Sequence, residues 1–291
     1  MAHIEKLVVV GAGLIGGSFA LALKRAGAVK HVVGVGRSEQ NIRRALELGL
    51  IDAAGALDAP TLGDADLVML AVPVGQMAPV MRTMAPLLGS RTVVTDAGST
   101  KQDVVELARR ELKGALARFV PGHPIAGTEH SGAGAAFAEL YLGRKVVLTP
   151  LAENAPEAVA RVRSAWEACG ARVLELKPQE HDAVFAAVSH LPHLLAYALV
   201  DQVARHENAK LLFSYAAGGF RDFTRVASSQ PEMWRDICMA NRKALLAELD
   251  RYRSGLDRVR ALLERGDAKA LESLFVEARA ARNRWLEENG R

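Results

Sequence analysis

The stretch PGHPIAGTEHSGAG, residues 121–134, gathers three ionisable side chains, His123, Glu129 and His130. Glycine and proline occur too often here for a core strand or a stable helix, so the stretch is predicted to be a loop. Loops held by a rigid scaffold commonly carry binding and catalytic residues. The first question that the sequence raises is therefore what chemistry these three side chains serve.

A second stretch with chemical potential lies near the N-terminus. Gly11, Gly13 and Gly16 form G-x-G-x-x-G between an apolar strand-like run, residues 7–10, and an apolar helix-like run, residues 18–25. The first glycine permits a tight turn, the second lets the backbone approach a pyrophosphate, and the third lets the helix pack on the strand. The free N–H groups of the helix would face the phosphates. This context favours dinucleotide binding over a purely structural glycine turn.

The coenzyme type is predicted from the end of the second strand-like run. In NAD-binding folds an acidic residue about 20 positions beyond the glycine turn binds the ribose 2′-hydroxyl. Here the count reaches Gly36, followed by Arg37 and Ser38, so an arginine rather than a carboxylate is available to a 2′-phosphate. We expect NADP to be preferred, with some use of NAD if a flexible loop swings Glu39 toward the ribose. The alternative is that Gly36 only turns the chain and Arg37 faces solvent.

Further candidates follow other predicted strands. The expected cofactor-binding residues are Gly11, Gly13, Leu14, Ile15, Gly16, Arg37, Ser38, Val72 and Pro73. DAGSTK, residues 96–101, ends one predicted strand, where open α/β sheets bind ligands. Two more clusters are HDAVFAAVSHLPH, residues 181–193, and GGFRDFTR, residues 218–225. Each also has an ordinary explanation, since Ser99 could cap a helix and His190 or His193 could be satisfied helical residues.

The elements that would position these residues change type once along the chain. Short apolar runs at 31–36, 65–73, 91–98, 145–150 and 171–176 are predicted strands, with helical segments between some of them. Such alternation predicts an α/β fold with a Rossmann-type, mostly parallel sheet covered on both faces. We expect this dinucleotide-binding domain to span residues 1–178.

Residues 179–291 are expected to form an all-helical dimerisation and substrate domain. The segment 181–205 is apolar on more than one face, and a helix of that kind must be buried against something large. Mutual burial in a homodimer is the preferred interpretation. A compact monomeric helical domain packed on the sheet is the alternative.

Composition narrows the function classes. The chain has 291 residues, 50% of them hydrophobic, and a net charge of only +4 with basic and acidic residues interspersed. Nucleic-acid binding is not expected, because basic residues are not clustered, whereas an anionic small molecule is a reasonable partner. Cys169 and Cys238 fit neither a metal site nor a disulfide framework. The apolar N-terminal run lacks a basic leader, so we expect a cytoplasmic protein without a membrane segment.

Taken together, these motifs resemble those of the prephenate/arogenate dehydrogenase family of tyrosine biosynthesis. The resemblance runs from VVGAGLIGGS through TDAGSTK, GHPIAGTEHSG and HDAVFAAVSHLPH to GGFRDFTRVASSQPEMWRDI, and so covers nearly the whole chain. It implies a dinucleotide-binding domain joined to a helical dimerisation domain. The implied reaction is oxidative decarboxylation of a cyclohexadienol, with hydride transfer from C4 to nicotinamide.

The resemblance also assigns residues. His123 matches the catalytic histidine, which would take the hydroxyl proton as the hydride leaves, and Ser99 matches a serine of the same cluster. Residues matching substrate-binding or supporting positions are Arg225, His193, Glu129, Asp222, Asp182 and Trp234. His130, His190, Arg221 and Arg235 are given no role.

Some relatives carry an additional chorismate mutase or regulatory domain, and neither is expected in this sequence. Tyrosine, if it inhibits, would then compete at the active site. The motifs leave the choice between prephenate and arogenate open. Two competing hypotheses are another hydroxyacid or imine reductase with a helical dimer domain and a non-catalytic dinucleotide sensor.

Overall fold

The computed structural model describes residues 3–128 and 130–289. Its contacts divide the chain into two units, Met1–Arg242 and Lys243–Arg291. The first unit contains two sheets and the helices that end at Ala240. The second contains most of α12 (Arg242–Glu264) and all of α13 (Ala268–Asn289), with Gly266 at a φ of 64° in the turn between them.

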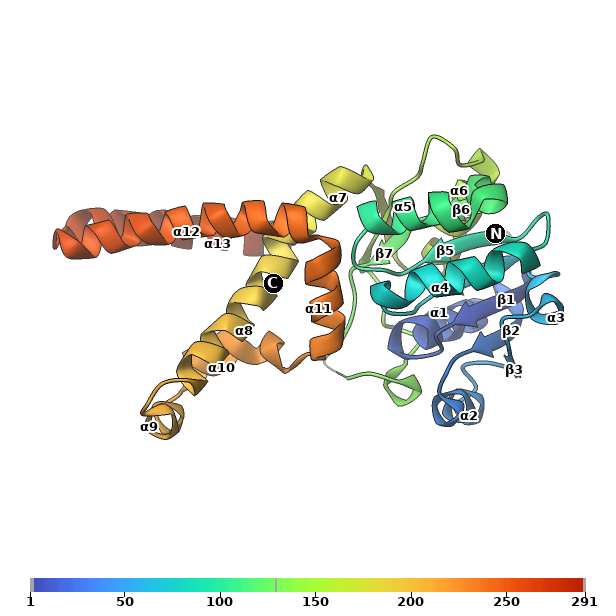
Figure 1. The fold of residues 1–291 in the computed structure, drawn as a ribbon, viewed down its shortest axis with the longest axis horizontal. Helices are drawn as coiled ribbons and strands as arrows, with labels where there is room; N and C mark the ends of the chain where they lie inside the picture. Colours follow the sequence, from blue (N-terminus) through green and yellow to red (C-terminus); the bar gives the residue numbers. More distant parts are fainter. Residues whose placement is uncertain (1–2, 129, 290–291) are drawn as a thin grey trace. The chain divides into compact units, whose positions relative to one another are not determined.

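Six strands form an all-parallel sheet in the order β3-β2-β1-β4-β5-β6 (Figure 1). They are β1 (Ile4–Val10), β2 (Val29–Val35), β3 (Ala53–Gly55), β4 (Leu67–Leu70), β5 (Val93–Asp96) and β6 (Phe119–Val120). The continuous apolar runs are needed because both faces of the central strands are covered, and all four residues of β4 are fully buried. The predicted Rossmann-type parallel sheet is confirmed.

Helices cover the two faces of this sheet. On one face lie α1 (Leu14–Arg25), α2 (Glu39–Glu47) and α6 (Pro156–Ala168); on the other lie α3 (Ala59–Leu62), α4 (Val74–Met84) and α5 (Gln102–Glu111). The short 3₁₀ turns of this part are η1 (Ala85–Leu87), η2 (Lys113–Arg118) and η3 (Ala133–Ala135). Strand order reverses between β1 and β4, and the carboxyl ends of strands at such a point form the usual ligand crevice of this architecture.

A second sheet carries the first of the candidate residues. It contains β7 (Gly122–Pro124), β8 (Lys145–Leu148) and β9 (Arg172–Glu175), with β7 antiparallel and β9 parallel to β8. His123 lies opposite Val147 in this pairing. The prediction of a loop throughout residues 121–134 is therefore wrong for residues 122–124. Proline is tolerated there because β7 is an edge strand, where a missing N–H costs no ladder bond.

Helices follow the second sheet, and the described residues from 179 onward contain no strand. They are α7 (Pro178–Phe185), a π-helical turn η4 (Ala186–His190), α8 (Leu191–Ala204), α9 (Ala209–Ser214), α10 (Gly218–Thr224), the 3₁₀ turn η5 (Arg225–Ser228) and α11 (Pro231–Ala240). The first three form one helix, Pro178–Ala204, which by length and composition could cross a membrane. Its first half is instead held by buried polar contacts, since His181 and His190 are each at most 1% exposed and hydrogen-bonded within the first unit.

The rest of this helical region leaves apolar side chains uncovered. Exposed large hydrophobic residues between positions 188 and 223 are Val188, Leu211, Leu212, Phe213, Tyr215 and Phe223. Val188 is 67% exposed and Tyr215 is 81% exposed. Exposed large apolar side chains concentrated in one helical region indicate an association surface.

The protein is therefore expected to be a homodimer. Sedimentation equilibrium at micromolar concentration should give a mass near twice 31.2 kDa, because mutual burial removes these side chains from water. A stable monomer with full function would contradict this expectation.

Candidate functional site

The glycine turn after β1 is shaped for a close approach. Gly11 has a φ of 100°, and a Cβ on Gly11 or Gly16 would overlap the backbone of Ala71 or of Gly11 itself. Gly13 is different, because the nearest atoms to a Cβ there belong to Gly132 at 3.9 Å. The packing of the chain itself does not require glycine at position 13. The lack of a side chain there leaves the space beside the turn open.

The N-terminus of α1 faces the same space. Gly13 is its N-cap and supplies no side-chain cap, and the first turn, which includes Leu14 and Ile15, has no acidic residue. Asn41 links this turn to the segment after β7: its Nδ2 donates to Ala12 O at 3.0 Å, and its Oδ1 accepts from Ala133 N at 2.8 Å. These contacts place the residues that follow the His123 strand beside the glycine turn.

The other cofactor candidates lie at neighbouring strand ends. Arg37 and Ser38 follow β2 and are exposed, and Ser38 Oγ accepts from Asn41 N at 3.2 Å as the N-cap of α2. Val72 is half-buried and Pro73 is exposed between β4 and α4. All of them therefore surround the carboxyl ends of β1, β2 and β4.

A buried ion pair fixes the segment after β5. Lys101 Nζ lies 2.5 Å from Asp96 Oδ2, and both side chains are fully buried. Asp96 also accepts from Gly98 N at 2.7 Å and from Gly122 N at 3.1 Å. The carboxylate thus ties the 96–101 segment to the start of β7, the strand that carries His123.

Ser99 lies in this segment, but it does not cap a helix as one interpretation of the sequence predicts. It is half-buried, and α5 begins only at Gln102, so Ser99 does not cap that helix. The carboxylate of Asp182 accepts instead from Lys101 N at 2.8 Å and from Gln102 N at 2.9 Å. Asp182 is 1% exposed and supports the site from within the protein.

His123 is the first member of a row of three side chains. Its Nδ1 lies 2.8 Å from His181 Nε2, and His181 Nδ1 lies 2.8 Å from Asp182 Oδ1. The ring of Phe185 packs edge-on against His123 at 4.8 Å. Burial lowers the pKa of His123 well below the ordinary histidine value, and the positive charge that His181 and Lys101 can present adds to this effect. His123 is therefore neutral at pH 7 and able to accept a proton.

A second group combines an aromatic face with a cation. The His193 ring stacks on Trp234 at 3.6 Å and 18°, and its Nδ1–H donates to Ser189 O at 2.9 Å. Trp234 is 8% exposed, and its indole N–H has no hydrogen-bond partner among the described residues. Burial lowers the pKa of His193, and the positive charge of Arg225 lowers it further. The charge of Arg225 therefore acts on the His193 ring, which is stacked on Trp234.

The remaining candidates are less constrained. Asp222 is exposed on α10, as are Arg221 and His130 in their segments. Glu129 lies outside the described residues, so its prediction stays untested. Arg235 is also exposed and pairs with Asp236 at 2.7 Å.

Several buried residues of the site were not singled out from the sequence. His181 links His123 to Asp182, and Asn241 Nδ2 donates to Asp182 O at 2.7 Å and to His190 Nδ1 at 3.0 Å. The only signal for His181 is its place directly before Asp182. Asn241 lies 59 positions from Asp182, and nothing in the local pattern connects them.

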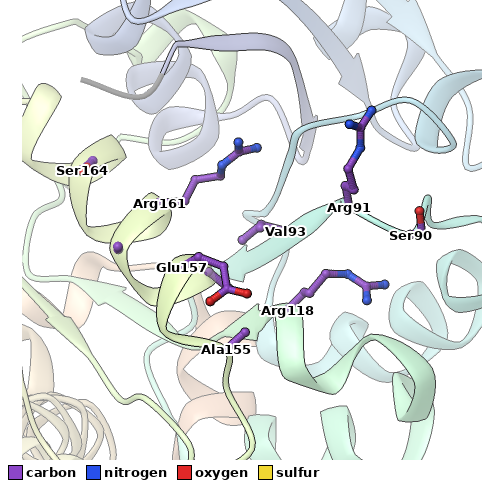
Figure 2. A pocket seen from close by; sticks show the side chains of 10 residues that line it. Ser90, Arg91, Val93, Arg118, Ala155, Glu157, Arg161 and Ser164 are labelled. Carbon is purple, nitrogen blue, oxygen red and sulfur yellow. The ribbon is translucent and has the colours of Figure 1, made fainter.

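A separate pocket lies between α6 and the segments that lead into β5 and β6 (Figure 2). Its basic lining is partly engaged in structure: Arg118 donates to Thr92 O at 3.1 Å, and Arg161 lies 3.5 Å from Asp66. None of the predicted site residues lines it. This pocket therefore gives no support to a site formed by the predicted residues.

The first unit of the chain therefore contains a dinucleotide-type glycine turn, the half-buried His123 with its lowered pKa, and a histidine stacked on Trp234. Family models match both parts: "prephenate dehydrogenase, nucleotide-binding domain" over residues 19–175 and "prephenate dehydrogenase, dimerization domain" over residues 177–277. The chain belongs to the prephenate dehydrogenase family.

Relatives within this family span nearly the whole chain. A cyclohexadienyl dehydrogenase of Zymomonas mobilis is 37% identical, over 97% of this chain and 96% of the relative. The prephenate dehydrogenase of Bacillus subtilis is also 37% identical, over 96% of this chain and 76% of its own. The Aquifex aeolicus prephenate dehydrogenase, solved with hydroxyphenyl propionate and NAD+, has a TM-score of 0.90 at 36% identity, with 96% and 98% of the chains covered. Synechocystis arogenate dehydrogenase has a TM-score of 0.81 at 33% identity, with 96% and 99% covered.

One pH prediction follows from the buried histidines of this dehydrogenase fold. Burial lowers the pKa of His190 to about 4, and its Nδ1 must stay unprotonated to accept from Asn241. Because the folded-state pKa lies below the unfolded value of about 6.5, protons bind the unfolded chain first as the pH falls. His190 should therefore cost about 2 kcal/mol of stability between pH 7 and pH 5.

Urea unfolding at the two pH values measures this loss. The matched variant His190→Asn keeps an acceptor near the Nδ1 position but does not titrate, so its loss of stability should be about 2 kcal/mol smaller. An equal pH dependence in both proteins would show that His190 is not held neutral.

Proposed function

We propose that this member of the family catalyses the oxidative decarboxylation of prephenate, arogenate or both, with hydride transfer to NAD(P). The products would be 4-hydroxyphenylpyruvate from prephenate and tyrosine from arogenate. The observation that carries the proposal is His123, a half-buried histidine whose pKa is lowered, on a strand that Asp96 ties to the end of β5. The names of the relatives, which include prephenate, arogenate and cyclohexadienyl dehydrogenases, support the same substrates.

The proposed role of His123 is that of general base. As hydride leaves C4, His123 Nε2 takes the proton of the C4 hydroxyl, so that a carbonyl forms rather than a cation. The bond between the ring and its carboxylate then breaks, and its electron pair enters the ring as carbon dioxide departs. The carbonyl oxygen on C4 becomes a phenolate as the ring becomes aromatic. It then takes the proton back from His123, which gives a phenol. Ser99, half-buried after β5, is proposed to hydrogen-bond within this cluster.

The substrate carries two carboxylates, which require fixed positive charge and donors. Arg225 is proposed to pair with one of them, because its planar guanidinium offers two parallel hydrogen bonds. His193, which is stacked on Trp234 and whose pKa the charge of Arg225 lowers, is proposed to bind the substrate with it, and Trp234 to hold the His193 ring in place. Glu129 and Asp222 are proposed to lie near the substrate, and Asp182 to support the site through its buried contacts.

The glycine turn fits the coenzyme. Gly13 leaves room that the chain itself does not need, and the uncapped N-terminus of α1 offers N–H groups to a pyrophosphate. Bound NAD(P)+ would supply the hydride acceptor. Leu14, Ile15, Val72 and Pro73 are proposed to line the same crevice, as their positions around β1 and β4 support.

We further propose that NADP is preferred over NAD, which would also be used. The strand end at Gly36 carries no carboxylate to repel a 2′-phosphate, and Arg37 is exposed with no ion pair among the described residues. Ser38 lies beside it at the N-terminus of α2. The Aquifex relative was solved with NAD+. The proposed preference for NADP therefore rests on residues 36–38 of this chain and not on that relative.

The assembly and location follow from the same family. We propose a homodimer built through the helical part, because that part matches a dimerization domain and exposes apolar side chains. The boundary between the two functional domains is proposed at residue 178, where α7 begins. The cytoplasm is the proposed location, in keeping with small-molecule biosynthesis.

His123→Asn tests the base directly. Turnover with prephenate or arogenate should fall by about 100-fold or more, the usual effect of losing a general base, while coenzyme affinity stays near that of the unmodified protein. His130→Asn is the matched control, since His130 is an exposed residue of the same segment, and it should keep full turnover. Near-normal turnover of His123→Asn would exclude His123 as the base.

Arg225→Ala tests substrate binding. The substrate dissociation constant should rise by about 30-fold or more, or about 2 kcal/mol, because a charge-assisted pair is lost. Coenzyme affinity should not change. Arg221→Ala, an exposed arginine four positions earlier, serves as control, and equal substrate affinity in the two variants would remove Arg225 from the site.

The coenzyme proposal is tested by kcat/KM with NADP and NAD. The unmodified protein should favour NADP, and Gly36→Asp with Arg37→Ile should reverse the order, because a carboxylate then repels the 2′-phosphate. A Cβ at position 36 meets only the flexible side chain of Ile42, at 3.1 Å, so the fold should accept the change. A clear advantage for NAD in the unmodified protein would show that Arg37 does not read the phosphate.

A further inference from the structure

The His123 ring has two nitrogens, and only one can serve as the base. Its Nδ1 lies 2.8 Å from His181 Nε2 and so faces into the protein. His181 Nδ1 in turn lies 2.8 Å from Asp182 Oδ1. His181 and Asp182 are 0% and 1% exposed, so water does not compete for these contacts. The state of one ring therefore depends on the other two side chains.

The direction of each hydrogen bond follows from the charge of Asp182. Burial alone would raise its pKa, but the bonds from His181, Gln102 N and Lys101 N outweigh that effect and hold the pKa below its usual value. An ionised carboxylate only accepts, so His181 must carry its proton on Nδ1. Its Nε2 is then a lone pair, and His123 must donate from Nδ1. The remaining nitrogen of His123, Nε2, is left as a free lone pair.

We propose that His181, held by Asp182, is a positioning residue that fixes the tautomer of His123 and so keeps its Nε2 unprotonated for the reaction. This inference rests on the proposed role of His123 as base. It assigns His181 no contact with the substrate. Asp182 acts like the carboxylate that orients the catalytic histidine of serine proteases. Here the ring of His181 lies between the carboxylate and the catalytic ring.

The surroundings keep the two imidazole rings of the row neutral until a proton arrives. The ammonium of Lys101 is paired with Asp96 at 2.5 Å, His190 is kept unprotonated by Asn241, and Phe185 covers the rings. When His123 gains the substrate proton, its Nδ1–H still donates to His181, and the carboxylate of Asp182 lies one ring beyond. The positive charge is thus stabilised without a rearrangement of the row.

The first test reads the tautomer without any reaction. Long-range ¹⁵N–¹H spectra of the full-length protein labelled with ¹⁵N-histidine, assigned with His123→Asn, distinguish a protonated from an unprotonated ring nitrogen. At pH 7.5 we expect His123 to be protonated at Nδ1 and unprotonated at Nε2, and His181 likewise. A proton on Nε2 of His123 would overturn the inference.

The second test uses a matched pair of variants at position 181. In His181→Gln the amide can occupy the place of Nε2 and accept from His123, whereas in His181→Asn it occupies the place of Nδ1 and keeps only the contact with Asp182. We expect kcat to fall by about 100-fold in His181→Asn but by less than about 10-fold in His181→Gln. Substrate KM and coenzyme affinity should stay within about twofold in both.

Three results would overturn this inference or the proposed function, and two of them tell the inference and the function apart. Equal kcat values in the two folded variants would overturn it, whatever their size. If the protein turned over neither prephenate nor arogenate, the proposed function would fail, yet the spectra would still report the His123 tautomer. An active protein with the proton on His123 Nε2 would overturn the inference alone.

Discussion

The carboxylate of Asp182 is the contact on which the rest of the site depends. This carboxylate accepts hydrogen bonds from two backbone N–H groups at the N-terminus of α5 and from His181. The backbone carbonyl of Asp182 accepts a further hydrogen bond from Asn241. One residue at the start of the helical part thereby joins the sheet helix α5, the His123 row and α11. Burying such a charge is costly unless it is fully hydrogen-bonded, and these bonds satisfy it. The same hydrogen bonds favour this one arrangement, because the loss of any donor leaves the buried charge incompletely hydrogen-bonded.

Neutral histidines form the second constraint. His123, His181, His190 and His193 all have pKa values lowered chiefly by burial. A base that must take a proton at neutral pH has to be unprotonated beforehand, and burial ensures this. Of the cations that act on these histidines, Lys101 is paired with Asp96 and Arg225 is exposed to solvent. In the proposed function, Arg225 therefore binds an anionic substrate while His123 stays neutral.

Much of the fold was predictable because its signals are local. The apolar runs of β1, β2, β4 and β5 and the glycine turn predict a parallel sheet, and the change to helices after residue 178 is equally clear in the pattern. The short strand β7 was missed, since Gly122 and Pro124 oppose a strand by propensity, and its pairing with β8 lies in residues 145–148. His123 was singled out by its motif, whereas its partner His181 depends on a contact across 58 positions that no local pattern encodes.

The central claim is that hydride removal and decarboxylation occur on one substrate at this site. The most direct test measures, in the same reaction, the carbon dioxide released and the coenzyme reduced when the purified protein is given prephenate or arogenate. The account predicts one carbon dioxide for each coenzyme reduced, with an aromatic product. Coenzyme reduction without release of carbon dioxide would contradict it, because the protein would then be a simple alcohol or hydroxyacid dehydrogenase.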